Sequence, residues 1–330
     1  MALYKTNGNH SAGLQHKVLI TGPVDKELLE EFTKVADIHV WEGRKEFLMP
    51  DKYLYSIVSN YDAIINFADV SVNKKLIIKA SRLKIIANAS AGFDNLDLQL
   101  LTKHKIWASN VPGVFSFPVA EYVLACILTL LRRLFEADQF VRNNEWKTFE
   151  PGRWDGASLK EKTLGIIGLG SIGKELRKMA LCLGATVIYF DPIIRKNKGW
   201  VPLELLTEQS DIISIHIPLN TNTFRLFNKK TIFNIKAGAI LVNTSRGAII
   251  EEAALIEALQ TGRLGGAVLD VFEQEPDVPD VFKEMRNVIL TPHIAGGTQT
   301  SRKDSIRRAF KNVSEVLTGS LPVNPLNMIQ

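Results

Sequence analysis

Short apolar runs alternate with amphipathic runs along this chain. The alternation predicts an α/β fold built on parallel sheets that helices cover on both faces. It occurs twice, from Lys17 to about Ser109 and from Thr163 to about Leu290, and only the second set begins with a glycine-rich turn. A chain of 330 residues can give each set its own core, so we predict two α/β domains.

The first set predicts a parallel sheet without a nucleotide site. We expect strands at Val18–Gly22, Asp37–Val40, Ala63–Asn66, Leu83–Ala89 and Ile106–Ser109, and helices at Asp25–Lys34, Tyr53–Ser59, Val72–Ala80 and Leu96–Lys103. Met1 to His16 are polar and lack the apolar stretch of a secretory signal, so we expect a loose lead-in there. Because no glycine fingerprint follows these strands, a dinucleotide is not expected in this domain.

The second set follows a long helical pattern from about Pro118 to Asn143. Its expected strands are Leu164–Ile167, Thr186–Phe190, Ile212–Ile217, Ala239–Asn243, Gly266–Leu269 and Val288–Leu290. A final helix is expected from about Thr300 to Leu317. Such a strand series with a glycine turn after its first member is the pattern of a Rossmann-type doubly wound sheet.

Gly168, Gly170 and Gly173 form a G-x-G-x-x-G turn between the first strand and a helical run. In a dinucleotide site these glycines permit a tight turn, close approach of a pyrophosphate and close packing of helix on strand. Asp191 ends the next strand about 20 residues on, where a carboxylate accepts hydrogen bonds from ribose hydroxyls and repels a 2′-phosphate. A glycine turn without a ligand is the alternative, but the ordered context favours NAD.

Composition argues against several other classes. The net charge is +5, but the only basic cluster lies on the last helix, where it is most simply a solvated face, so we expect no nucleic-acid partner. The longest apolar run, Tyr122 to Leu131, is too short to span a bilayer. Cys126 and Cys182 are expected to be buried structural thiols, which fits a cytoplasmic protein, and no metal site is predicted.

Three loops that follow strands of the second set carry polar residues. They are Val242-Asn-Thr-Ser-Arg-Gly247, Leu269-Asp-Val-Phe-Glu-Gln-Glu-Pro276 and Leu290-Thr-Pro-His-Ile-Ala-Gly296. Ligands bind at the carboxyl ends of strands in such sheets, so Arg246, Glu275 and His293 are candidate site residues. Taken singly, each has a plain structural alternative: a salt bridge, a solvated acid and a turn histidine.

Taken in order, the motifs G-L-G-S-I-G, N-T-S-R-G, L-D-V-F-E-Q-E-P and T-P-H-I-A-G resemble those of D-isomer-specific 2-hydroxyacid dehydrogenases. This family includes D-lactate, glyoxylate/hydroxypyruvate and D-3-phosphoglycerate enzymes, and the resemblance covers nearly the whole chain. It implies a coenzyme domain of residues 113–297 inserted into a flavodoxin-like substrate domain of residues 1–112 and 298–330. It also implies NAD-dependent reduction of a small 2-oxo acid to the D-2-hydroxy acid, and the reverse reaction.

The resemblance further implies that Arg246, Glu275 and His293 form the catalytic triad. Arg246 would grip the substrate carboxylate and polarise the adjacent carbonyl. His293 would give a proton to the developing alkoxide, because the ordinary pKa of histidine lies near neutrality. Glu275 would hydrogen-bond the other ring nitrogen and favour the imidazolium.

Further contacts are implied by the same resemblance. Backbone N–H groups of Ala91 and Gly92 would bind the substrate carboxylate, and Arg246 and His293 would also contact the substrate. The long helix that Val119-Ala-Glu121 opens forms much of the dimer interface in relatives, so a homodimer is expected. The remaining cofactor contacts would be Ser171, Ile172, Ile217, Pro218, Thr223, Thr244 and Asp270, the last at the nicotinamide carboxamide.

Three alternatives stay open at this point. Many D-3-phosphoglycerate dehydrogenases carry an appended regulatory domain that this chain would be too short to hold, although shorter forms exist. A formate dehydrogenase is disfavoured, because its relatives pair the histidine with glutamine where this chain has Glu275. A non-enzymatic NAD-sensing module of the same superfamily retains the triad, so the motifs do not separate it from an enzyme.

Overall fold

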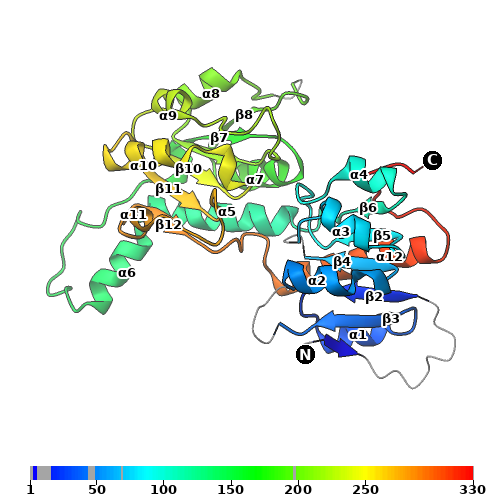
Figure 1. Ribbon diagram of the computed structural model, residues 1–330. Coiled ribbons are helices and arrows are strands. Elements are labelled where there is room, and N and C mark those ends of the chain that lie inside the picture. The colour runs from blue at the N-terminus through cyan, green and yellow to red at the C-terminus, as the bar shows by residue number, and fades with distance from the viewer. Residues whose placement is uncertain (1–2, 6–15, 44–48, 68–69, 196–197, 330) are drawn as a thin grey trace. The chain divides into compact units, whose positions relative to one another are not determined.

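The computed structural model describes residues 3–5, 16–43, 49–67, 70–195 and 198–329. The chain forms two units, Met1–Phe115 with Thr298–Gln330, and Ser116–Gly297 (Figure 1). Each unit contains one six-stranded sheet with helices between the strands. The predicted α/β class, with two largely parallel sheets, is confirmed. The assignment of residues 1–112 and 298–330 to a substrate domain and of residues 113–297 to a coenzyme domain stays a prediction.

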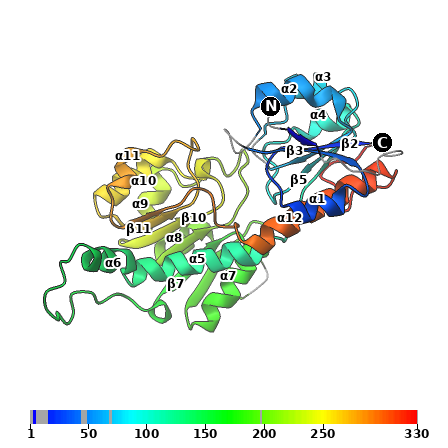
Figure 2. The same ribbon diagram turned by 90° about the horizontal axis from the view of Figure 1, so that it is seen from below.

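The first unit is flavodoxin-like. Its strands lie in the order β1 (Leu3–Lys5), β3 (Asp37–Trp41), β2 (Lys17–Ile20), β4 (Ala63–Asn66), β5 (Ile85–Asn88) and β6 (Trp107–Ser109). All neighbours are parallel except β1 and β3, and the parallel strands follow the flavodoxin order 2-1-3-4-5. Figure 2 shows α1 (Lys26–Phe32) beside α12 (Gln299–Leu317) on one face, whereas α2 (Asp51–Ile57), α3 (Lys74–Lys79) and α4 (Leu98–Lys103) cover the other.

Both faces of this sheet are apolar, which explains why its strands are continuous apolar runs. In β2, Val18 and Ile20 pack under α1 and α12, whereas Leu19 packs under the opposite helices. Burial on both faces is what a parallel sheet requires. On α12, Lys303 and Arg307 form ion pairs with Glu27 and Glu31 of α1, so part of the basic cluster is matched by acids.

The second unit has a Rossmann-type sheet. Its parallel strands lie in the order β12 (Val288–Leu290), β11 (Leu264–Leu269), β10 (Ala239–Asn243), β9 (Ile212–Ile215), β7 (Thr163–Ile167) and β8 (Thr186–Phe190). Beyond β8, Trp200 pairs with Tyr189 as an isolated parallel bridge. This bridge occupies the place of the third strand in the order 3-2-1-4-5-6, so that strand is reduced to a single pair.

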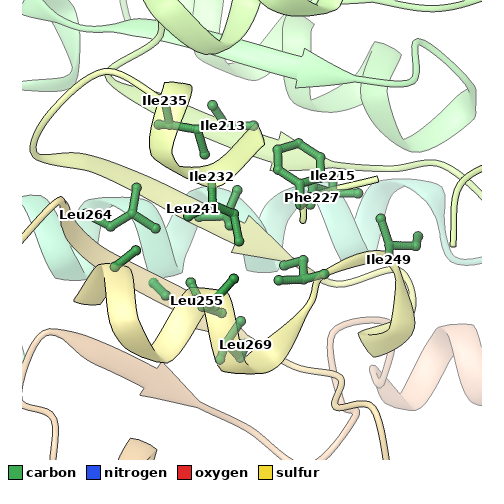
Figure 3. Close-up of a cluster of buried hydrophobic side chains, with 14 of the residues drawn as sticks. Ile213, Ile215, Phe227, Ile232, Ile235, Leu241, Ile249, Leu255, Leu264 and Leu269 are labelled. Carbon is green, nitrogen blue, oxygen red and sulfur yellow. The ribbon is translucent and has the colours of Figure 1, made fainter. Parts of the chain in front are cut away.

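Helices cover both faces of the second sheet. α8 (Leu203–Gln209), α9 (Lys229–Asn234) and α10 (Glu252–Gln260) enclose the apolar cluster of Figure 3, in which Ile213 and Leu241 of the sheet meet Ile232 and Leu255. α5 (Ser116–Leu131) and α7 (Ser171–Cys182) pack together on the opposite face (Figure 2). The shorter helices α6 (Leu134–Arg142) and α11 (Asp280–Lys283) complete the unit. Among the described residues, no helix is long and apolar enough to cross a bilayer.

Three sequence predictions are wrong. The single helix expected over 118–143 is two helices, because the chain adopts a left-handed conformation at Arg133 with φ of +53°. Leu3–Lys5 is not a loose lead-in but strand β1, paired with β3, whereas most of the other residues before Lys17 lie outside the described part. Cys126 is buried as expected, but Cys182, the last residue of α7, is exposed.

Candidate active site

The glycine turn after β7 is built by close backbone approaches. Gly168 has φ of +94°, and its N–H donates to the Phe190 carbonyl at 2.8 Å. A Cβ on Gly168 would lie 2.7 Å from the His216 carbonyl oxygen, and a Cβ on Gly173 would collide with the carbonyl of Gly168. At Gly170, by contrast, a Cβ would meet no atom within 4 Å. Two glycines therefore close the turn, and the third leaves open space beside the backbone.

This open space lies at the N-terminus of α7. Gly170 is the N-cap, and Ser171 and Ile172 begin the first turn. N–H groups of a first turn have no partner within their helix, and the helix dipole makes this end positive. The arrangement suits a pyrophosphate, and the contacts expected of Ser171 and Ile172 stay predictions.

Asp191 holds the glycine turn in place. The side chain is buried, with 8% exposed. Its Oδ2 accepts from the Leu169 N–H, and its Oδ1 accepts from the N–H groups of Ile193 and Ile194, each at 2.8 Å. Burial alone would raise the pKa of Asp191, but these N–H donors outweigh it and hold the pKa below its ordinary value. A carboxylate has about four acceptor positions, so capacity for a ribose hydroxyl remains.

Other predicted cofactor residues lie at the same edge of the sheet. Ile217 is buried after β9, and the neighbouring Pro218 is exposed. The Thr223 hydroxyl donates to the Pro218 carbonyl at 2.7 Å and so closes this loop. After β10, the Thr244 hydroxyl is buried, and within the described chain it has no hydrogen-bond partner. A buried orphan hydroxyl beside the open glycine turn fits a bound polar ligand, and these residues fit a nicotinamide dinucleotide.

Arg246 is presented by a loop that Asn243 shapes. The buried Asn243 side chain accepts from the Ser245 N–H at 3.0 Å and donates to the Arg246 carbonyl at 2.9 Å. A Cβ on Gly247 would collide with the backbone of Phe272. The loop that carries Arg246 therefore lies directly against the loop that carries Glu275.

The turn that carries His293 wraps around Asp270, which is fully buried at the end of β11. Asp270 Oδ1 accepts from the Thr291 hydroxyl at 2.6 Å and from the Ile294 N–H at 2.8 Å, and Oδ2 accepts from the Ala295 N–H at 2.8 Å. The His293 N–H donates to the Asp270 carbonyl at 2.9 Å. His293 has φ of +54°, a left-handed conformation that is unusual outside glycine and that this network maintains.

His293 and Glu275 form a charge-assisted pair. His293 Nδ1 lies 2.8 Å from Glu275 Oε2, and Glu275 Oε1 accepts from the Phe272 N–H at 3.1 Å. The bond to Glu275 raises the pKa of His293 against the opposing effects of burial and of Arg246. Burial would raise the pKa of Glu275, but His293 and Arg246 help to lower it overall. The histidine side chain is 51% exposed, so its other nitrogen, Nε2, is open to a reactant.

The second histidine of this unit, His216, has the opposite environment. Its Nε2 lies 2.8 Å from the Ser214 hydroxyl, and burial lowers its pKa to about 4. A ring that stays neutral is a poor proton donor near neutral pH. The geometry and charge therefore favour His293 as the acid–base residue.

The loop of Ala91 and Gly92 lies in the first unit, after β5. Side chains tie down its carbonyl groups: the Asn110 amide donates to the Ala91 carbonyl at 2.7 Å, and the Ser90 hydroxyl donates to the Gly92 carbonyl at 2.9 Å. Among the described residues, no acceptor is recorded for the N–H groups of Ala91 and Gly92. Such N–H groups can bind an anion.

Comparison with known proteins identifies the family. Residues 124–295 match the model of the D-isomer specific 2-hydroxyacid dehydrogenase NAD binding domain. The chain is 37% identical over 325 residues to a glyoxylate reductase of Thermococcus litoralis, an alignment that covers 95% of this chain and 97% of the relative. This chain belongs to the D-isomer-specific 2-hydroxyacid dehydrogenase family. It is an NAD(P)-dependent D-2-hydroxyacid dehydrogenase, as the motifs predicted.

Other relatives of this dehydrogenase show a range of activities. A D-3-phosphoglycerate dehydrogenase of Synechocystis sp. is 34% identical over 92% of this chain and 54% of its own length. Among solved structures, the TT0316 protein of Thermus thermophilus has a TM-score of 0.89 at 33% identity, covering 94% of this chain and 99% of that one. An NADPH-dependent glyoxylate/hydroxypyruvate reductase of Sinorhizobium meliloti has a TM-score of 0.81 at 26% identity, covering 94% and 96%.

The structure thus brings Glu275 and His293 into contact and places the charge of Arg246 near both. The supporting residues Asn243, Gly247 and Thr291 were not singled out from the sequence. The motifs contain all three residues, but only the contacts in the folded chain show that they position the loops of Arg246 and His293. Asp270 was expected at the nicotinamide carboxamide, and that role stays a prediction. The structure shows that Asp270 accepts hydrogen bonds from the turn that carries His293.

Gly247 and Gly170 should respond differently to an added methyl group. Gly247→Ala would force the loops of Arg246 and Glu275 apart, so we expect a loss of about 1–3 kcal/mol in the free energy of unfolding and a lower kcat. Gly170→Ala meets open space, so its melting temperature should stay near that of the wild type while NADH binding weakens. Calorimetry and NADH fluorescence titration measure both effects. Equal stability of Gly247→Ala and the wild type would contradict the close approach.

Proposed function

We propose that this enzyme uses NADH to reduce a small 2-oxo acid to the 2-hydroxy acid, in the D form where C2 becomes a stereocentre, and that it also runs the reverse reaction. Glyoxylate, whose product glycolate is achiral, is the first candidate substrate. The 2.8 Å contact of His293 with Glu275, under the influence of Arg246, carries the proposal. The glyoxylate reductase of Thermococcus litoralis supports the choice of substrate class, because it aligns with nearly the whole chain.

In this mechanism the Arg246 guanidinium binds the substrate carboxylate and polarises the keto oxygen. The bound nicotinamide supplies the hydride. His293 Nε2–H gives its proton to the oxygen as negative charge develops there, and Glu275 stabilises the imidazolium before transfer. For the Ala91 and Gly92 loop we propose carboxylate binding by its two N–H groups. Ser171 and Ile172 would bind the pyrophosphate, and Thr244 would give a further polar contact.

A panel of 2-oxo acids tests the reaction. NADH oxidation should be followed with glyoxylate, pyruvate, hydroxypyruvate, 3-phosphohydroxypyruvate and branched 2-oxo acids. Turnover of a small 2-oxo acid supports the proposal. Preference for 3-phosphohydroxypyruvate would favour the phosphoglycerate dehydrogenase alternative, to which the Synechocystis relative points. Absence of turnover with every acid would favour an NAD-sensing module.

His293 should control both the rate and its pH dependence. His293→Ala should lower kcat roughly 10²–10⁴-fold with NADH binding nearly intact. The bond to Glu275 holds the pKa of His293 above its ordinary value, so the reduction rate should be full below the raised pKa and fall as pH rises through it. The rate of the reverse oxidation should fall as pH drops through the same pKa, because that reaction needs neutral His293 as the base. Glu275→Gln removes the main cause of the raised pKa and should move both transitions to lower pH. An unchanged kcat in His293→Ala would reject the role.

We propose NAD as the preferred cofactor, because Asp191 would repel the 2′-phosphate of NADP. The Sinorhizobium meliloti relative uses NADPH, so the preference needs a direct test. Asp191→Asn keeps the shape of the side chain and removes its charge, and Asp191→Ala removes both. Each should lower the ratio of kcat/KM for NADH to that for NADPH, by roughly tenfold for the loss of one close charge. An unaltered ratio in both variants would refute the assignment.

We also propose a homodimer. Large apolar side chains are exposed on α5, α6 and the segment that follows: Phe117, Leu134, Phe135, Val141, Trp146 and Phe149, the last with 81% of its surface accessible. Exposed apolar groups concentrated on one segment are typical of a subunit interface.

A cytoplasmic location stays a prediction, consistent with the two free cysteines.

Charges placed on this segment should dissociate the dimer. Phe135→Asp with Trp146→Asp should shift the molar mass in size-exclusion chromatography with light scattering from dimer to monomer. Ile78→Asp on α3 is the matched control, because Ile78 is also an exposed apolar residue but lies in the other unit. A dimer that survives the double substitution, or a wild type that is monomeric at micromolar concentration, would overturn the proposed interface.

A further inference from the structure

We propose that Tyr122 on α5 is a positioning residue for His293, acting through Thr291 and Asp270. Tyr122 lies outside the four motifs that carry the family resemblance. The inference rests on the proposed function, in which His293 transfers the proton. It assigns to α5 a part in the reaction that is separate from any part in a subunit interface.

The hydrogen bonds that link Tyr122, Thr291 and Asp270 have a fixed direction. The Thr291 hydroxyl has one hydrogen, which it donates to Asp270 Oδ1 at 2.6 Å. Its oxygen lies 2.5 Å from the Tyr122 hydroxyl, so at that contact the phenol is the donor. Burial raises the pKa of Tyr122, so the phenol keeps its proton. Tyr122 therefore donates to Thr291, and Thr291 donates to Asp270.

Asp270, the last acceptor in this series of hydrogen bonds, controls the turn that carries His293. Asp270 receives the N–H groups of Ile294 and Ala295 on its side chain and that of His293 on its carbonyl. The left-handed backbone of His293 depends on these bonds for its conformation. If the Thr291 hydroxyl were free to rotate, Asp270 Oδ1 would lose a donor, and the turn would have more freedom.

Tyr122 gives this network a rigid anchor. It lies inside the sixteen-residue helix α5, which packs along α7 and contacts β11. Tyr122 and Thr291 are 169 positions apart in the chain, so the contact ties the turn after β12 to an element that precedes the whole sheet. A small displacement of His293 would lengthen its 2.8 Å bond to Glu275, and proton transfer depends on that geometry.

The test compares variants that remove single hydroxyl groups. Tyr122→Phe and Thr291→Val should each lower kcat, roughly fivefold for the loss of one network hydrogen bond, with little change in KM for NADH. Thr291→Ser keeps the hydroxyl and should restore most of the rate. The double variant Tyr122→Phe/Thr291→Val should be no slower than Thr291→Val alone, because both residues act through the same series of hydrogen bonds.

Tyr61→Phe is the matched control. The Tyr61 hydroxyl is also buried, 2.7 Å from a histidine nitrogen, but it lies in the other unit. Its loss should change the melting temperature without changing kcat. If Tyr122→Phe behaves like Tyr61→Phe, its hydroxyl is merely structural and the proposal is wrong. Additive losses in the double variant would also overturn it.

A second measurement needs no cofactor or substrate. The His293 ring proton signal can be titrated by NMR in the unliganded protein, with His293→Ala to assign it. Glu275, Arg246 and Asp270 are the charged groups that face this ring. In Tyr122→Phe the pKa of His293 should fall toward its ordinary value, because the contact with Glu275 loosens, whereas in Tyr61→Phe it should not move. An unchanged pKa together with an unchanged kcat contradicts the positioning role. Absence of turnover in the wild type would instead contradict the proposed function, and the titration would still test the positioning.

Discussion

The buried carboxylate of Asp270 accepts three hydrogen bonds from the segment 291–295, and its carbonyl accepts a fourth from the His293 N–H. These bonds determine where His293, the proposed proton donor, lies. With the backbone fixed, His293 Nδ1 reaches Glu275 and its Nε2 stays open to a reactant. The raised pKa of His293 follows from this contact, so the proposed acid–base chemistry depends on Asp270, a residue that need not take part in proton transfer.

The parallel sheet explains why such distant residues converge. Parallel strands all end at one edge, so the loops after β7, β9, β10, β11 and β12 lie side by side although helices separate them in sequence. Gly168 at one loop and His293 at another are therefore parts of one edge. Gly247 then brings the Arg246 loop against the next loop, because hydrogen is the only side chain that fits beside the Phe272 backbone.

Local patterns made much of this architecture predictable. The glycine turn, the strand ends and the polar residues after them are encoded within short windows, and strand β8 was correctly placed with Asp191 at its end. Contacts between distant segments were not predictable. Tyr122 meets a partner in another part of the chain, and β1 exists only because β3 offers it an edge. The break at Arg133 has neither glycine nor proline to signal it, so the helical periodicity continued through it.

A buried side chain that accepts hydrogen bonds from the following loop occurs at three strand ends of the second unit. Asp191 after β8, Asn243 at the end of β10 and Asp270 after β11 are each buried, and each accepts N–H groups from the loop that follows. A buried acceptor without donors would be costly, so each of these side chains strongly favours one conformation of its loop. Residues at such positions act on the reaction twice, through any direct contact with a ligand and through the shape of the loop. A loss of activity on substitution of Asp191 or Asp270 therefore does not by itself demonstrate ligand contact. Only a readout specific to the ligand, such as the ratio of NADH to NADPH efficiency, or one specific to the loop, such as the pKa of His293 in the unliganded protein, separates the two effects.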